Sequence, residues 1–291
     1  MKRYKKQFLG LDAAETSFQN AKVVLLPLCY EGGVSYGRGA AQGPDAIINA
    51  SCYLELYDEV LDAEPYTVGI CTVEPPEIPA DPHDMVQKVY ETTKSILGKG
   101  KFVILIGGDH SVTPGYCRAL QEKYHTLSVI QFDAHADLRR SYEGSEFSHA
   151  CVMSRIREIT TDTLQIGIRS LSGEEAQRVK EEDISICTMN DYRKGYFSLR
   201  SSLKQLPDPV FITFDVDVFD WSVIRSTGTP EPGGFFWHEA ISLLQEIFSV
   251  KRVVGFDIVE LVGDDNDRNS SFAAAKLIYK VIGFNGFIQK L

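Results

Sequence analysis

The sequence lacks the segments that would insert a protein into a membrane or carry it out of the cell. Its first ten residues are basic, but they have neither the apolar stretch nor the small-residue cleavage site of a secretory signal peptide. No part of the 291 residues approaches the run of about 20 apolar residues that a membrane-spanning helix needs. We therefore expect a cytoplasmic protein.

Cysteine and positive charge are both scarce. The six cysteines are scattered without a Cys-x-x-Cys pair, which is typical of reduced thiols packed as small hydrophobic residues. The 30 Lys and Arg residues are outnumbered by 40 Asp and Glu residues, so the formal net charge is −10. This charge argues against nucleic acid or an anionic membrane surface as a partner, and it mildly favours a cationic substrate.

Linkers, low-complexity tracts and internal repeats are also missing, so residues 1–291 are predicted to form one domain. Alternating patterns predict an α/β protein with eight strands whose polar clusters follow the strand ends. An open sheet and a closed eight-stranded barrel both fit this pattern. The predicted strands are 22–26, 66–70, 102–106, the run beginning at 129, 164–168, 184–188, 210–214 and 253–258, and the predicted helices begin near 45 and 238 and span 83–97, 112–124 and 174–182.

The run from Val129 to Asp137 carries the strongest functional signal. It is apolar at first and then places Asp133, His135 and Asp137 at every second position. If the strand geometry continues through the end of this run, the three side chains point the same way. Burying three ionisable groups together is costly without a cation among them, so we predict a metal site.

Two other predicted strands end in similar residues. Strand 102–106 leads to Asp109 and His110, and strand 210–214 leads to Asp215 and Asp217. We interpret Asp109 as a capping residue before Ser111, because a lone Asp at a strand end is usually a cap. The remaining groups give two histidines and at least four carboxylates, a donor set suited to two divalent metals in a hydrolytic site.

Two further residues are candidates for roles beside the metals. His149 follows the loop 138–148, and it fits a proton carrier as well as it fits a helix-start residue held by Ser148. Glu260 follows the last predicted strand at the same edge as the other clusters. For this reason a substrate contact is favoured over a capping or surface role.

Together these residues resemble the ureohydrolase family, which comprises the arginases and agmatinases. The resemblance implies an open three-layer α/β/α fold with a mainly parallel eight-stranded sheet, in place of the barrel. It also implies two Mn²⁺ ions per subunit and a homo-oligomer, either a trimer or a hexamer. The motifs that carry it are Gly107-Gly-Asp-His-Ser111, Asp133-Ala-His-Ala-Asp137, Ser148-His149, Asp215-Val-Asp217 with Asp220, Ser226-Thr-Gly-Thr-Pro-Glu-Pro-Gly-Gly234 and Asp257-Ile-Val-Glu260.

The resemblance also implies roles for individual residues. One ion would be bound by His110 and Asp137, the other by His135 and Asp217, and both by the bridging Asp133 and Asp215. Asp137 would orient the attacking hydroxide, Glu260 would pair with the guanidinium group of the substrate, and His149 would carry a proton to the leaving amine. No organic cofactor is expected.

The expected substrate is a small cationic guanidino compound, and agmatine, converted to putrescine and urea, is favoured. Arg139 stands where arginases have an asparagine, and the loop 138–148 resembles that of agmatinases; its Glu143 and Glu146 could meet the distal ammonium. Alternatives are aminopropylagmatine, guanidinobutyrate, arginine, a non-catalytic metal-binding relative and a single-zinc deacetylase. Trp221 and Arg225 depart from the family, which has prolines there, and they make the local loop shape and the substrate fit uncertain.

Overall fold

The computed structural model describes residues 1–12 and 15–289, and its centre is an eight-stranded sheet. Every neighbouring pair of strands is parallel, and the order across the sheet is β2-β1-β3-β8-β7-β4-β5-β6. The strands are β1 (Val23–Leu28), β2 (Ile70–Thr72), β3 (Phe102–Gly107), β4 (Ser128–Phe132), β5 (Thr163–Ile168), β6 (Ser185–Thr188), β7 (Val210–Asp215) and β8 (Val253–Val259).

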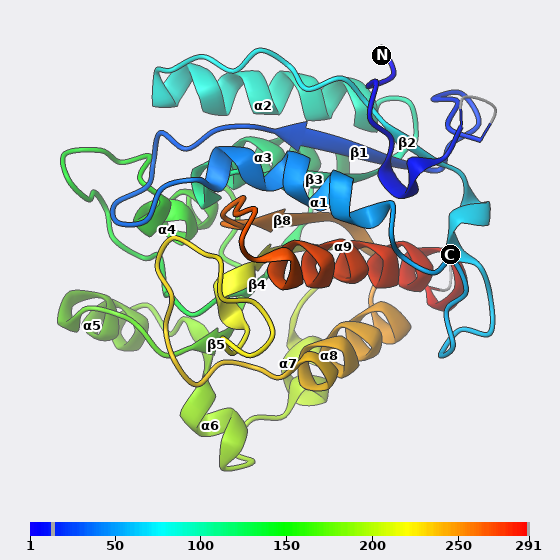
Figure 1. Ribbon diagram of the computed structural model, residues 1–291. Coiled ribbons are helices and arrows are strands. Elements are labelled where there is room, and N and C mark those ends of the chain that lie inside the picture. The colour runs from blue at the N-terminus through cyan, green and yellow to red at the C-terminus, as the bar shows by residue number, and fades with distance from the viewer. Residues whose placement is uncertain (13–14, 290–291) are drawn as a thin grey trace.

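Helices cover both faces of this sheet, which explains why its central strands are almost continuously apolar. One hydrophobic cluster joins the sheet to α1, α6, α7, α8 and α9, and a second joins the opposite face to α2, α3, α4 and α5. In Figure 1, α1 and α9 lie side by side in front of the sheet. The helices are α1 (Gly43–Ser51), α2 (Pro82–Leu97), α3 (Thr113–Tyr124), α4 (Val152–Arg157), α5 (Gly173–Glu181), α6 (Met189–Arg193), α7 (Leu199–Gln205), α8 (Trp237–Val250) and α9 (Arg268–Gly283).

This architecture confirms the open three-layer α/β/α fold and excludes the barrel, because β2 and β6 stand at the two edges of the sheet. The prediction of a strand over 66–70 is wrong. Pro65–Val68 forms a 3-10 turn, Gly69 follows with a φ of +82°, and strand pairing begins only at Ile70. Proline fixes its own φ near the helical value, so it favours this turn over an extended start.

A buried ion pair attaches α9 to the loop that follows α1. The Lys280 ammonium lies 3.0 Å from each carboxylate oxygen of Asp58, and both side chains are buried. The Tyr279 hydroxyl hydrogen-bonds the backbone carbonyl of Leu56 in the same loop. Helices α6, α7 and α9 were not predicted from the sequence, and neither were these contacts of α9.

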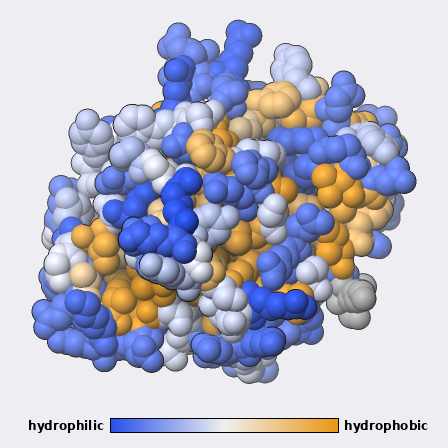
Figure 2. All heavy atoms as spheres, turned by 90° about the horizontal axis from the view of Figure 1, so that it is seen from below, coloured by the Kyte–Doolittle hydropathy of each residue, from blue (hydrophilic) through white to orange (hydrophobic). Residues whose placement is uncertain are grey.

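Four of the six cysteines are buried, as the sequence predicts, and two are exposed. Cys71, Cys117, Cys151 and Cys187 are buried free thiols as expected, but the free thiols of Cys29 and Cys52 are exposed. Among the described residues, no helix has the length and apolar character needed to cross a bilayer. Figure 2 shows one face of the molecule, where hydrophilic side chains divide the hydrophobic ones into separate patches.

Candidate metal centre

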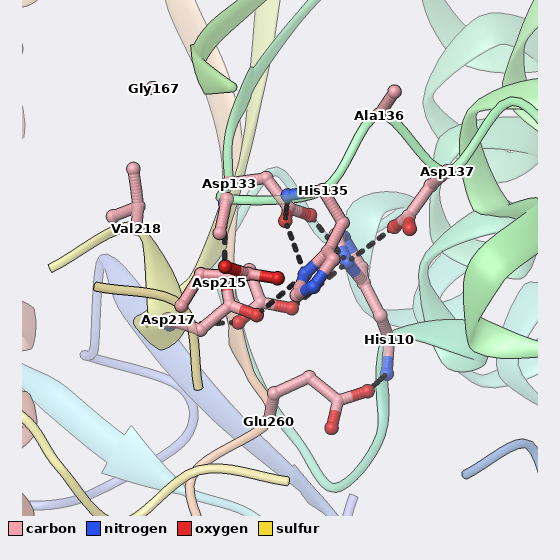
Figure 3. A network of polar contacts seen from close by, with 12 residues as sticks. His110, Asp133, His135, Ala136, Asp137, Gly167, Asp215, Asp217, Val218 and Glu260 are labelled. Atoms are coloured by element: carbon pink, nitrogen blue, oxygen red, sulfur yellow. Dashed lines mark hydrogen bonds and ion pairs between the residues drawn. The ribbon is translucent and has the colours of Figure 1, made fainter. Parts of the chain in front are cut away.

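The predicted metal ligands gather at the carboxyl-terminal ends of β3, β4 and β7. In a parallel sheet these ends lie along one edge, which is where ligand sites form in open α/β proteins. The short 3-10 turn His110–Val112 follows β3, and another, Val216–Val218, follows β7. Figure 3 shows the six predicted ligands pointing toward one another, with Glu260 beside them.

The chain does not continue as a strand through the ligands after β4. The strand ends at Phe132, His135 forms only an isolated bridge with Ser170, and Asp137 has a φ of +52°. The prediction that strand alternation would align the three side chains is therefore wrong. They converge because the backbone turns, and the Asp133 carboxylate supports this turn by accepting a 2.6 Å hydrogen bond from the His135 amide.

The first group of ligands surrounds the Nδ1 atom of His110. This atom lies 3.2 Å from an Asp133 oxygen, 3.3 Å from an Asp137 oxygen and 3.3 Å from an Asp215 oxygen. The His110 side chain is buried, yet its Nδ1 has no hydrogen-bond partner of good geometry among the described residues. A buried polar atom seldom lacks a partner, so this orphan atom fits a metal ligand.

The second group is formed by His135, Asp217 and again Asp133. The His135 Nδ1 lies 2.9 Å from an Asp217 oxygen and 3.6 Å from an Asp133 oxygen. One Asp217 oxygen accepts a 3.0 Å hydrogen bond from the Ala134 amide, and the other, which faces His135, has no hydrogen bond of good geometry among the described residues. Because Asp133 belongs to both groups, the residues fit two adjacent divalent cations with a carboxylate shared between them.

The electrostatics of the cluster indicate that it needs positive charge. Burial, together with the charge of Asp133, raises the pKa of Asp137 to about 7. Burial and the neighbouring aspartates also raise the pKa of Asp215 and of Asp217. Burial alone would raise the pKa of Asp133 too, but the two histidines outweigh it and lower that pKa. Bound cations would stabilise the ionised carboxylates that the buried site otherwise disfavours.

Asp109 lies close to this cluster but faces away from its centre. Its carboxylate accepts a 2.9 Å hydrogen bond from the Ser111 amide and a 2.6 Å hydrogen bond from the Gly33 amide. Burial and the nearby charge of Glu260 raise the pKa of Asp109 to about 6. The prediction that Asp109 is a cap is confirmed, and the same carboxylate anchors the loop after β1.

The structure confirms that His149 is a helix-start residue, because it is the first residue of the 3-10 turn His149–Cys151 and Ser148 caps this turn by accepting a hydrogen bond from the Ala150 amide. The proton-carrier role stays a prediction. The His149 ring lies between Glu260, 3.1 Å from its Nδ1, and Ser35, 2.8 Å from its Nε2. Burial would lower the pKa of His149, but the hydrogen bond and charge of Glu260 outweigh it and raise that pKa to about 9.

Glu260 is a buried acid with a φ of +66°, not a surface residue. One of its oxygens accepts a 2.8 Å hydrogen bond from the His110 amide and also faces His149, while the other has no partner among the described residues. Glu260 thus connects the metal ligands to His149. Its free oxygen can accept a further hydrogen bond from a cationic group.

A cavity of about 170 Å³ opens above the ligands. Its outer wall contains Arg139, whose guanidinium stacks over Tyr142 at 4.8 Å from the ring centroid. A larger cavity of about 330 Å³ lies between α2 and α3 and contains none of the predicted site residues. The residues lining the site cavity are Ser35, His110, His135, Asp137, Arg139, Tyr142, His149, Ala150, Asp215 and Thr229.

Of the loop residues singled out from the sequence for their bearing on the substrate, Arg139 lines this cavity and the others do not. Glu143 and Glu146 are exposed and do not line it, and Glu146 lies 3.5 Å from Arg155. Arg225 pairs at 3.2 Å with Asp267, the residue that caps α9, and Trp221 is half-exposed. Both departures from the family therefore shape the loop after β7 without removing a predicted ligand.

Sequence reasoning missed Ser35 and a set of polar residues inside the strands. Ser35 gave little signal because it stands in a glycine-rich loop whose position depends on distant contacts. Gln131 and Thr213 were detectable in principle, since each is a polar residue within an otherwise apolar buried strand. Burying such groups without a partner is costly, so they indicate a polar structure beneath the ligands.

Residues 21–283 match the model of the Arginase family. The chain belongs to the arginase family. It is 37% identical over 98% of its length and 95% of the relative to an N(1)-aminopropylagmatine ureohydrolase from Synechocystis. It is also 35% identical to an agmatinase from Pyrococcus horikoshii, with 97% of this chain and 98% of the relative covered.

Solved structures agree with this membership. The agmatine ureohydrolase of Thermoplasma volcanium superposes with a TM-score of 0.86 at 28% identity, covering 97% of this chain and 95% of that chain. This member of the arginase family is therefore an amidinohydrolase of the agmatinase or aminopropylagmatine ureohydrolase type.

Proposed function

We propose that this chain uses two Mn²⁺ ions to hydrolyse the guanidinium group of N1-aminopropylagmatine, and that agmatine is its second substrate. Loss of urea from the former leaves an aminopropyl derivative of putrescine, and loss of urea from the latter leaves putrescine itself. The chain would thus supply polyamines. The observation that carries the proposal is the presence of Asp133 in two overlapping, buried His/Asp groups at the base of one cavity.

The mixed nitrogen and oxygen donors support the choice of metal. His110 and Asp137 would hold one ion, His135 and Asp217 the other, and Asp133 and Asp215 would contact both. Imidazole and carboxylate together suit first-row divalent metals such as manganese. When bound, two such ions lower the pKa of a shared water, so that a nucleophile is available at neutral pH.

Side chains that line the cavity, together with the buried Glu260, which does not line it, would bind and orient the substrate. The unpartnered oxygen of Glu260 can accept hydrogen bonds from the guanidinium group, whose planar fork matches a carboxylate. Asp137 would accept a hydrogen bond from the attacking nucleophile and orient it. His149 holds a proton near neutral pH because its pKa is raised to about 9, so it can protonate the leaving nitrogen.

The order of the two substrates is supported by the relatives. The Synechocystis relative at 37% identity is named for aminopropylagmatine, whereas the Pyrococcus relative at 35% is named for agmatine. Sequence reasoning favoured agmatine because the loop 138–148 resembles that of agmatinases, and this keeps agmatine as the second candidate. The structure offers no acid of that loop in the cavity wall that would select agmatine.

A urea assay on manganese-loaded protein tests the proposal. The substrates are N1-aminopropylagmatine, agmatine, guanidinobutyrate and arginine. We expect kcat/KM to be highest for N1-aminopropylagmatine and to decrease in the order given. A higher kcat/KM for agmatine would reverse the two candidates. Release of no urea from any of the four would contradict the proposed activity and favour a non-catalytic metal-binding relative.

Metal analysis tests the proposed centre separately from the activity. We expect two manganese ions per chain after loading and dialysis. One zinc ion per chain would instead support the single-zinc alternative.

The expected trimer or hexamer stays a prediction, and light scattering coupled to gel filtration would test it by giving the molar mass of the assembly.

A further inference from the structure

Four polar side chains form a row across the sheet, one level below the proposed ligands. They come from neighbouring strands and pair in register: Gln165 of β5 with Gln131 of β4, Gln131 with Thr213 of β7, and Thr213 with Asp257 of β8. All four are completely buried. Burying uncharged and charged polar groups in the centre of a sheet is costly unless their hydrogen bonds are satisfied, so the row calls for an explanation.

The two middle members of the row each contact a proposed ligand. The Gln131 side-chain amide donates a 2.7 Å hydrogen bond to an oxygen of Asp133. The Thr213 hydroxyl lies 2.8 Å from the Nε2 atom of His110, on the side of the ring opposite to the carboxylates. The row therefore reaches both the shared carboxylate and one of the two histidines.

Fixed acceptors determine which way the two glutamine amides face. A carboxylate oxygen of Asp133 accepts from Gln131, so Gln131 presents its NH₂ group to Asp133 and turns its carbonyl oxygen toward Gln165. The NH₂ group of Gln165 donates to this oxygen at 2.5 Å and to the backbone carbonyl of Ala136 at 2.7 Å. Because both ends of the chain of hydrogen bonds are obligate acceptors, neither amide can flip without losing bonds.

The Asp133 carboxylate is consequently held at both of its oxygens before any metal binds. One oxygen accepts from Gln131 and the other from the His135 amide at 2.6 Å. These two bonds fix the plane of the carboxylate. The orientation of this plane decides whether the carboxylate can bind two ions at once. The backbone turn after β4 could not fix that plane alone, since it contacts only one oxygen.

We propose that Gln131 is a positioning residue that orients Asp133 for metal binding, and that Gln165 acts only by holding Gln131. Thr213, which also hydrogen-bonds Asp257, plays the corresponding part for His110. This inference rests on the proposed two-metal centre and goes beyond it, because neither glutamine contacts an ion or the substrate. Outer partners that orient metal ligands typically change metal affinity by about 10- to 100-fold when they are removed.

The test is a titration of Mn²⁺ into metal-free protein, with free Mn²⁺ measured by its electron paramagnetic resonance signal. The variants are Gln131→Met, Gln165→Met and the double variant, which remove the amides at nearly constant length. We expect Gln131→Met to weaken Mn²⁺ binding by about 10- to 100-fold and Gln165→Met to weaken it less. In the double variant, Gln165→Met should add nothing to the effect of Gln131→Met, since its action passes through Gln131.

Gln7→Met is the matched control, because Gln7 is a buried glutamine that hydrogen-bonds the backbone of Tyr4 and Thr72 away from the site. It should lower the melting temperature but leave the Mn²⁺ affinity unchanged. Unchanged affinity in Gln131→Met, or equal losses from Gln165→Met in both backgrounds, would overturn the inference. If Gln131→Met does not fold, unchanged affinity in both Gln165→Met and Thr213→Val overturns it.

A wild-type chain that binds no Mn²⁺ would give a different result from any of these. It would remove the metal centre of the proposed function, and the positioning role would be rejected with it. Wild-type binding of two ions with unaltered affinity in the glutamine variants would reject only the positioning role.

Discussion

Asp133 is the residue on which the two ligand groups depend most. Its oxygens lie within 3.2 Å of the His110 Nδ1 and 3.6 Å of the His135 Nδ1, so it faces both proposed ion positions. Asp215, the other proposed shared ligand, lies in the first group only, and each of the remaining ligands lies near one proposed ion position. A change at this single carboxylate should therefore affect both ions, whereas a change at His135 should affect one more than the other.

We predict that Asp133→Ala loses both ions and the activity. The reason is that removing a shared carboxylate leaves two cations close together with too little negative charge between them. Metal analysis and the urea assay measure the outcome. Asp45→Ala, which removes a partly buried acid paired with Lys6, should keep both ions; full metal content in Asp133→Ala would show that Asp133 is not shared.

We predict that His149→Ala keeps its ions but has a kcat lower by about 10²-fold or more, the usual contribution of a general acid. The His149 ring contacts Glu260 and Ser35 and none of the proposed ligands directly. Steady-state kinetics and metal analysis on the same preparation test this. His83→Ala serves as the control because His83 is exposed, and a kcat equal to the wild-type value in His149→Ala would exclude the proton-carrier role.

The raised pKa of His149 also predicts a pH dependence of stability in the metal-free protein. A pKa raised from 6.5 to about 9 means that the folded state holds the proton more tightly than the unfolded chain. This stabilisation is complete below pH 6.5 and is lost as the pH rises through about 9, and at most it amounts to about 3 kcal/mol.

Urea unfolding at pH 6 and pH 9.5 measures this difference. The wild-type chain should lose more stability between the two pH values than His149→Ala, which lacks the titrating group. Equal losses of stability in the two proteins would mean that the contact with Glu260 does not raise the pKa of His149.

At the scale of elements, the strand ends were predictable and the turns after them were not. Apolar runs followed by acids and histidines located β3, β4 and β7, because buried parallel strands must be apolar and their carboxyl ends face one edge. The positive φ of Asp137 could not be anticipated, since it depends on contacts with a neighbouring loop such as the bridge between His135 and Ser170. The predicted ligands do lie together, but for a partly different geometric reason than the expected strand alternation. Their binding of a metal stays a prediction.

Helix α9 shows another limit of sequence reasoning. Its buried Lys280 does not look like a core residue in the sequence, and its partner Asp58 lies 222 positions away. Only the folded chain brings the two charges together. The pair holds the loop after α1 against α9, so its removal should act on both elements.

We predict that Lys280→Met lowers the free energy of unfolding by about 3–5 kcal/mol, because Asp58 is left buried without its cation. Urea denaturation measures the change. Lys180→Met on the exposed side of α5 should change stability by less than about 0.5 kcal/mol. A similarly small effect at position 280 would indicate that water replaces the lysine.

For the molecule as a whole, the order of elements predicted the class of fold but not its closure. Both an open sheet and a barrel alternate strands with helices, and the choice depends on whether the two edge strands meet. The resemblance to ureohydrolases supplied the answer that the pattern could not. The cavity wall contains Arg139 and Tyr142 but no acid from the loop 138–148, so it has no carboxylate from this loop that would bind the distal ammonium of the substrate.

We predict that Mn²⁺ raises the melting temperature of the metal-free protein and that a chelator reverses the effect. Each ion that binds only the folded state adds about 2.7 kcal/mol at a free concentration 100 times its Kd. Differential scanning calorimetry with and without Mn²⁺ measures the shift. Mg²⁺ should have a smaller effect because it prefers oxygen donors, and no shift with Mn²⁺ would argue against a buried ion site.

The sheet order has a consequence for the biosynthesis of this molecule. Strand β8, which follows the seven other strands in the sequence, lies between β3, which precedes His110, and β7, which ends at Asp215. A nascent chain that has emerged only as far as β7 still has a gap in the middle of its sheet. Ion uptake should therefore wait until β8 has emerged, so ribosome-stalled chains ending before residue 252 should not retain manganese.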